Sequence, residues 1–232
     1  MCTVSYFPLE GGYVLTSNRD EDPGRRTLDP EIQILPGGVR VLAPRDMEKG
    51  GTWIALDETG RAVCLMNGAF GRHERTPPYR KSRGLLAFEA MEASDFELFS
   101  GQTNLRGIEP FTLLMVSPGR ILKLVWDGNR RNYWKIPAGS PALWSSPTLY
   151  TGHQHAMKER YLKNAMLKEE ITPEKILQLH GEGSDTPFIL KGKQVCTVSI
   201  TQLVCSGREV SMQYFNKVKD DDKVTRIHLA AV

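Results

Sequence analysis

The chain alternates between short apolar stretches and polar turns in a way that predicts paired β-strands. Runs rich in β-branched, aromatic and aliphatic residues come in pairs, and a turn that contains glycine joins the members of most pairs. The predicted hairpins join residues 2–8 to 13–19, 52–57 to 61–67, 111–117 to 120–127, and 194–205 to 209–215.

Three segments between these hairpins carry helical signals. The first follows a cap at Ser82 and repeats apolar residues at three-residue spacing. The second, residues 152–169, has Lys and Glu on most positions and an apolar side formed by Met157, Tyr161, Ala165 and Met166. The third begins at Thr172-Pro173 and stops at Gly181. This order predicts an α+β fold of two packed antiparallel sheets with helices outside. No linker or repeat is evident, so residues 1–232 are expected to form a single domain.

The composition is that of a soluble globular protein, with 40% hydrophobic and 25% charged residues. No apolar run is long enough to span a bilayer, and no signal peptide is evident at the start. Four cysteines without metal-ligand spacing are too few for a disulfide framework, so we expect reduced thiols, no metal and a cytoplasmic location. The net charge of +3 is too weak to favour nucleic acid as a partner.

The first hairpin carries the residues with the clearest chemical interpretation. Cys2 directly follows the initiator methionine, whose removal would leave a thiol and a free α-amine on one residue. The thiolate is a nucleophile, and the amine can serve as its base. Asn18 and Asp20 share one face of the second strand and Arg19 lies on the other. If the hairpin pairs Cys2 near these residues, Asp20 can stabilise the ammonium. The alternative is a small apolar cysteine followed by a polar turn.

Longer stretches show a resemblance to a known family. "CTVSYFPL…YVLTSNRDEDPGRRT" resembles the opening of the NRDE-domain family, also called the transport-and-Golgi-organization protein 2 family. The match continues in "LAPRDMEKGGTWIALDETGRAVCLMN", "SRGLLA", "PFTLLMVSPGRILKLVWDG" and "ALWSSPTLY", and covers most of the first 165 residues. The order and spacing of Met-Cys-Thr, NRDE and GGTW make this resemblance specific.

The resemblance implies the fold of the N-terminal-nucleophile hydrolases, a four-layer αββα sandwich. The pattern is similar to that of choloylglycine hydrolases, penicillin V acylases and acid ceramidases. By position it implies that Cys2 is the nucleophile, Asp20 its partner and Asn18 the asparagine at the strand end. It also implies that Asn67 donates to the oxyanion, an interaction worth roughly 3 kcal/mol in comparable sites.

Two positions depart from the hydrolase pattern. Ser17 stands where those enzymes often have arginine, and Ser145 stands where they use an asparagine. Members of the NRDE family have been linked to haem trafficking, to lipid or acyl-CoA handling and to Golgi organisation, so the resemblance does not imply one reaction.

Two functional hypotheses follow. The first is Cys-dependent hydrolysis or acyl transfer on a small or lipid-like amide. The second is a non-enzymatic carrier of haem or an acyl or lipid ligand, gripped by the basic segment 72–83, "RHERTPPYRKSR". Arg19, Trp53, Arg72 and Ser145 are the candidate ligand-binding residues in either case. The simpler interpretation of segment 72–83 is a solvated loop, and a structural interaction protein is a third, weaker hypothesis.

Overall fold

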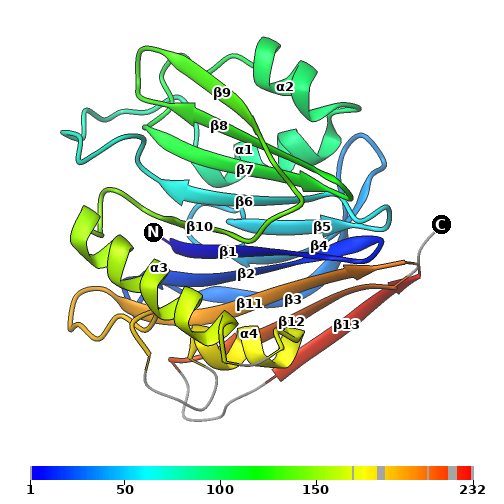
Figure 1. Cartoon of the computed structure of the whole chain (residues 1–232). Helices are drawn as coiled ribbons and strands as arrows, with labels where there is room; N and C mark the ends of the chain where they lie inside the picture. Colours follow the sequence, from blue (N-terminus) through cyan, green and yellow to red (C-terminus); the bar gives the residue numbers. More distant parts are fainter. Residues whose placement is uncertain (1, 169, 182–185, 208, 219–223, 231–232) are drawn as a thin grey trace.

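The computed structural model describes residues 2–168, 170–181, 186–207, 209–218 and 224–230. Its elements form two antiparallel sheets and four helices within these residues (Figure 1).

One sheet has six strands in the order β10-β1-β2-β11-β12-β13, and all neighbouring strands are antiparallel. Its strands are β1 (Cys2–Leu9), β2 (Gly12–Glu21), β10 (Ala142–Ser145), β11 (Cys196–Ser206), β12 (Glu209–Asn216) and β13 (Val224–Ala230). The first hairpin is thus flanked by strands from much later in the sequence.

The other sheet has seven strands, which follow one another in sequence order from β3 to β9. These are β3 (Thr27–Ile34), β4 (Arg40–Asp46), β5 (Ile54–Asp57), β6 (Ala62–Asn67), β7 (Phe111–Ser117), β8 (Arg120–Trp126) and β9 (Arg131–Ile136). Each strand pairs antiparallel with the next, as a meander.

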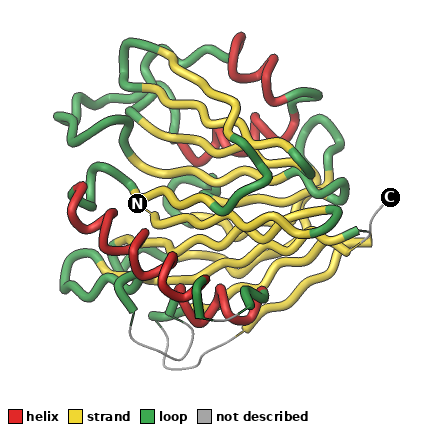
Figure 2. The backbone as a smooth tube through the Cα atoms, in the orientation of Figure 1, coloured by secondary structure: helices red, strands yellow, loops and turns green. Residues whose placement is uncertain are grey.

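Helices cover the outer face of each sheet. Helix α1 (Arg83–Glu92) contacts β5 and β6, and α2 (Phe96–Gln102) contacts β8. Helix α3 (Gly152–Met166) contacts β10, and α4 (Pro173–His180) contacts β2 and β11. The two sheets face each other, with β1 against β6. Figure 2 shows the strands between the outer helices, which is the expected four-layer αββα sandwich.

Strand alternation separates two apolar layers. Val4 and Leu15 face the other sheet and pack in a large cluster with Ile54 and Met115. The alternate residues face α3 and α4, where Phe7 packs with Leu162 and Phe188 among others. Because each strand of the first hairpin is buried on both faces, polar residues within it also become buried. Within the described residues, no helix is both long and apolar enough to cross a membrane.

The four predicted hairpins are confirmed as β1–β2, β5–β6, β7–β8 and β11–β12. The first turn contains Gly11 with a φ of 70°, a left-handed conformation that favours glycine. The predicted caps of the first and third helices are confirmed too, whereas α3 ends at Met166 and its predicted end at residue 169 lies outside the described residues. Ser82 accepts a hydrogen bond from the amide of Gly84, and Gly181 ends α4 with a φ of 108°. Strands β3, β4, β9, β10 and β13 and helix α2 were not predicted.

The prediction of the apolar side of α3 is confirmed for Tyr161 and Ala165, which pack against the layer of Phe7 and Leu162, and is wrong for Met157 and Met166. Met157 is 44% exposed, whereas Lys158 is only 2% exposed and is buried together with Leu162. The helix has few apolar residues, so its periodicity defines no clear face. The buried face of α3 also includes the Lys158 amine, whose contacts are described below.

Candidate functional site

Cys2 is the first residue of β1 and points into the space between the two sheets. It is 1% exposed and belongs to the same apolar cluster as Val4 and Tyr6, as the alternation predicts. Its sulfur lies 3.6 Å from the carbonyl oxygen of Leu65 on β6, to which the thiol donates. The register of the hairpin pairs Cys2 with Arg19, so these two side chains share a face.

Cys2 lines a small cavity of about 70 Å³ at the edge of the sandwich. Four of the residues singled out in the sequence meet here: Cys2, Arg19, Trp53 and Asn67. They come from β1, β2, the segment before β5 and the last position of β6. The start of α1 closes the remaining side.

The wall formed by α1 depends on a close backbone approach. The amide of Thr52 donates to the carbonyl oxygen of Gly84 at 3.1 Å. A Cβ atom on Gly51 would lie 2.3 Å from the backbone of Gly84, too close for any side chain. The glycines of the "KGGTW" and "SRGLLA" stretches therefore allow the helix to begin directly beside the cavity.

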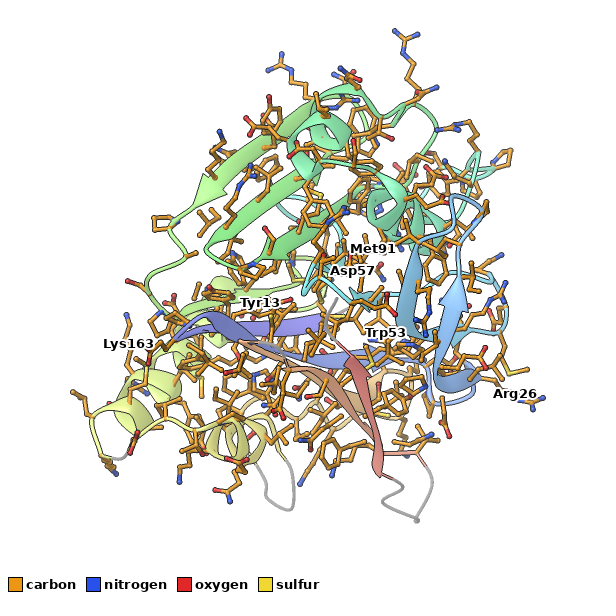
Figure 3. All side chains as sticks on the ribbon, turned by 90° about the vertical axis from the view of Figure 1, so that its right-hand side faces the viewer. Tyr13, Arg26, Trp53, Asp57, Met91 and Lys163 are labelled. Atoms are coloured by element: carbon orange, nitrogen blue, oxygen red, sulfur yellow. The ribbon has the colours of Figure 1, made fainter. Side chains whose placement is uncertain are left out.

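The cavity wall carries five charged side chains, which are the three arginines Arg19, Arg25 and Arg83 and the two carboxylates Glu21 and Asp46. Arg19 and Arg25 both bind the carboxylate of Asp46, at 2.9 and 2.7 Å. Burial opposes ionisation of Asp46, but the hydrogen bond from Arg25 and the charges of both arginines lower its pKa. The Arg19 guanidinium also lies 4.2 Å from the centre of the Trp53 ring, and Figure 3 shows that tryptophan between the sheets. Asp46 thus holds two guanidiniums at one side of the Cys2 cavity.

Asp20 and Asn18 lie on the opposite face of β2, because residues of even number point toward the helices. The Asp20 carboxylate accepts hydrogen bonds from the hydroxyls of Tyr150 and Thr197, both at 2.7 Å. The side-chain amide of Asn18 donates to the carbonyl oxygens of His180 and Phe188, at 2.8 and 3.0 Å. Asn18 therefore fixes α4 and the following segment to the sheet and lies outside the Cys2 cavity.

A buried lysine lies beside Asp20 on this face. The amine of Lys158 lies 2.5 Å from the Thr3 hydroxyl and 3.1 Å from the centre of the Tyr150 ring. Burial lowers its pKa to about 7, although the Asp20 carboxylate opposes this shift. Burial likewise raises the pKa of Asp20, and the hydrogen bonds from Tyr150 and Thr197 and the charge of Lys158 counteract that increase. A titratable cluster thus lies directly behind the first two residues of β1.

Comparison with known families agrees with the resemblance seen in the sequence. The model of the family "Transport and Golgi organisation 2" matches residues 1–188. This chain belongs to that family. No match is found among curated protein sequences.

Similar solved structures place this family member in the N-terminal-nucleophile hydrolase fold. An N-acylethanolamine-hydrolyzing acid amidase orthologue from Caenorhabditis elegans has a TM-score of 0.60 at 10% identity, covering 88% of this chain and 92% of its own. A conjugated bile acid hydrolase from Clostridium perfringens has a TM-score of 0.57 at 9% identity, covering 98% and 92%. Penicillin V acylase from Agrobacterium tumefaciens has a TM-score of 0.57 at 11% identity, covering 98% and 86%. At these identities the likeness shows the fold alone.

Two of the ligand-binding residues predicted from the sequence of this protein lie outside the Cys2 cavity. Arg72 is exposed in the loop after β6. Ser145 lines a second cavity, where its hydroxyl lies 3.1 Å from Nδ1 of His155. No group of three or more potential metal ligands is found among the residues that the structure describes.

Two charged residues of the cavity wall were not anticipated: Arg25 and Asp46. Arg83 is the last residue of the basic segment 72–83, for which the sequence predicts a positive lip; Arg83 lines the cavity, whereas Arg72 does not. Arg25 follows the NRDE stretch, but its exposed neighbour Arg26 points away from the protein (Figure 3). Only the tertiary arrangement separates these neighbouring arginines.

Proposed function

We propose that this protein is an N-terminal-nucleophile hydrolase or acyltransferase that uses Cys2 on a small or lipid-like amide. The observation that carries the proposal is the cavity that Cys2 and Asn67 share, because it brings a thiol and a side-chain amide together at a chain start. Within the described residues, the Asn67 side chain makes no hydrogen bond, so its amide is free to donate to a ligand.

The thiol needs a base in this environment. Burial raises the pKa of Cys2 and the Asp20 carboxylate adds to the increase, whereas the Ser17 hydroxyl and the Arg19 guanidinium lower it. After removal of the initiator methionine, the α-amine of Cys2 is the nearest group of suitable pKa. Asp20 follows Arg19, the register partner of Cys2, and so lies toward the strand end that carries this amine.

The proposed reaction has two steps. The Cys2 sulfur attacks the acyl carbon and its proton passes to the α-amine, while the Asn67 amide donates to the oxyanion. The tetrahedral intermediate then collapses to a thioester, and the departing amine takes the proton from the ammonium. Water, or an acceptor amine in acyl transfer, attacks the thioester and restores the thiol. Asp20 stabilises the ammonium between these steps, held in place by Tyr150.

The similar structures guide the choice of substrate. They include an N-acylethanolamine-hydrolyzing amidase and a conjugated bile acid hydrolase, so amides with a lipid-like acyl part are the first class to test. The cavity of about 70 Å³ has room for only a few atoms around the reacting bond. The rest of such a substrate would lie outside it.

The alternative is a non-enzymatic carrier of haem or an acyl or lipid ligand. The observation that favours it is the second cavity, which is lined by apolar and polar side chains and so could hold an amphipathic ligand. The basic segment 72–83 contributes less than the sequence suggests, because Arg75 and Arg83 both bind Glu109 and Lys81 binds Glu89. These ion pairs reduce the free positive charge of the segment but do not remove it, because two arginines share the one carboxylate of Glu109.

The proposal includes two further inferences from the sequence. We infer that residues 1–232 act as one NRDE-type domain, which the pairing of β2 with β11 supports. We also infer a cytoplasmic location, which is supported by the four free cysteines.

A labelling experiment distinguishes a chemically activated thiol from one that reacts only because it is exposed to solvent. Cys196 is the most exposed of the four thiols, and Cys2, Cys64 and Cys205 are buried. If exposure alone decides, iodoacetamide modifies Cys196 first. The proposal predicts that Cys2 reacts first, and that Cys2→Ala, but not Cys196→Ala, abolishes release of aminomethylcoumarin from its N-lauroyl amide. First reaction at Cys196, with equal hydrolysis by both variants, would reject the proposal.

A further inference from the structure

The second cavity lies where the two sheets meet α3, and it shares no lining residue with the Cys2 cavity. Its volume is about 470 Å³, within the usual range of 300–1,000 Å³ for small-molecule sites. Residues from the ends of β6 and β7, from β8, from β10 and from the start of α3 line it. It is large enough for an alkyl chain and a head group.

The wall of this cavity combines an apolar part with the polar side chains of Thr112, Ser145, Thr151 and His155. Met66, Leu143, Trp144 and Pro147 contribute to its walls. Met66 is only 1% exposed, so it forms the deep end of the cavity. An apolar wall of this kind gains free energy when it removes a hydrocarbon surface from water.

The rim carries aromatic rings that no other part of the fold explains. Phe70 is 63% exposed and Trp134 is 42% exposed, and their rings meet edge to face at 6.4 Å. Single exposed apolar residues are common on protein surfaces, but adjacent large ones typically mark an interaction site. These two residues come from the loop after β6 and from β9, so the fold brings them together at the mouth of the cavity.

The same rim holds a lysine without a counterion. Lys123 on β8 lines the cavity, and its amine lies 5.6 Å from the centre of the Trp134 ring. It makes no ion pair with any carboxylate in the described part of the chain. Its pKa is lowered by partial burial. An anionic group at this position would restore the balance of charge.

We propose that this cavity binds a single-chain anionic amphiphile, with its carboxylate at Lys123 and its hydrocarbon chain along Leu143 and Trp144 toward Met66. The polar group lies at the rim and the apolar wall lies inside, which matches the two ends of such a molecule. A neutral lipid would leave the lysine unpaired, and a small hydrophilic anion would leave the wall unoccupied.

The site adjoins the proposed catalytic centre but does not depend on it. The amide of Ser146, next to the cavity residue Ser145, donates to the carbonyl oxygen of Cys2 at 2.9 Å. Tyr150 lines the cavity and also holds Asp20 through its hydroxyl. A bound chain would therefore lie one strand away from the nucleophile. The inference would stand even if Cys2 carries out no reaction.

The test measures binding of sodium laurate to the full chain by calorimetry, below the critical micelle concentration, with dodecanol as the neutral analogue. Lys123→Met should weaken laurate binding by about tenfold, the effect of losing one charge-assisted contact, and should change dodecanol binding less than twofold. The matched control is Lys135→Met on β9, whose side chain is 69% exposed and already paired with Glu97. Trp144→Ala should weaken the binding of both laurate and dodecanol.

Three results would overturn the inference. The first is no laurate binding to the wild-type chain. The second is that Lys123→Met and Lys135→Met weaken laurate binding equally, or that Lys123→Met weakens laurate binding and dodecanol binding by the same factor. The third is loss of laurate binding in Cys2→Ala, which would place the ligand in the other cavity. Retained binding by Cys2→Ala with no amide hydrolysis by the wild type would reject only the catalytic proposal. Melting temperatures of all variants verify that each is folded.

Discussion

Replacing Lys158 with Met gives a pH-dependent change in stability that the structure fixes in sign. The amine is buried at 2% exposure, and its pKa falls from 10.5 to about 7 on folding. Between these pH values the unfolded chain keeps the proton and the folded chain does not. Unfolding then takes up a proton, so the free energy of unfolding of the wild type rises with pH across this window. Met has a similar volume to Lys but no titratable group. The free energy of unfolding of Lys158→Met should therefore not show this rise with pH.

The magnitude follows from the two pKa values. One pKa unit corresponds to about 1.4 kcal/mol, so the wild type should gain about 3 kcal/mol relative to Lys158→Met between pH 6 and pH 9.5. The groups that face the amine are Asp20 on β2, Tyr150 before α3 and His180 on α4. The pKa of His180 is lowered to about 3 by burial and by Lys158, so it stays neutral throughout this range.

Urea unfolding at several pH values measures this difference. The matched control is Lys163→Met on the same helix, because Lys163 is exposed and lies on the outer side (Figure 3). Its stability should follow that of the wild type at every pH. A pH-independent difference between wild type and Lys158→Met, or an identical slope in both lysine variants, would refute the buried titratable amine.

Two further substitutions test the wall of the Cys2 cavity. Asn67→Ala should lower kcat for the N-lauroyl amide by about 10²- to 10³-fold with the melting temperature unchanged, as expected for an oxyanion donor; an unchanged kcat would remove Asn67 from the mechanism. Gly51→Ala should destabilise by about 1–3 kcal/mol in thermal unfolding, because its Cβ would meet the backbone of Gly84. Gly139→Ala, at a position with open space, is the control, and equal stability of the two variants would contradict the close approach.

Most of the fold could be predicted where the sequence itself carries turns and caps. The four hairpins have glycine at or beside their turns, and the helix starts have side-chain caps at Ser82 and Thr172. The elements that were missed lack such signals. Strand β9 has mostly exposed or half-buried residues, β3 contains Pro30, and α2 is only seven residues long. Their conformation depends on neighbouring strands more than on local sequence.

The site was predictable only in part, for a similar reason. Alternation in β2 correctly separates Arg19 from Asn18 and Asp20, but only the register of the hairpin shows that Arg19, and not Asp20, shares the face of the Cys2 side chain. It could not reveal that Arg83 closes the cavity or that Asp46 gathers two arginines, because these contacts join separate segments. The burial of Lys158 was missed because a lysine on a polar helix is ordinarily exposed.

Intact mass spectrometry of the purified protein, before and after incubation with the N-lauroyl amide, tests the central claim most directly. The account predicts that the initiator methionine is absent and that a transient lauroyl thioester forms on the N-terminal peptide of the wild type but not of Cys2→Ala. A retained methionine, or a lauroyl adduct on Cys196 in place of Cys2, would contradict it.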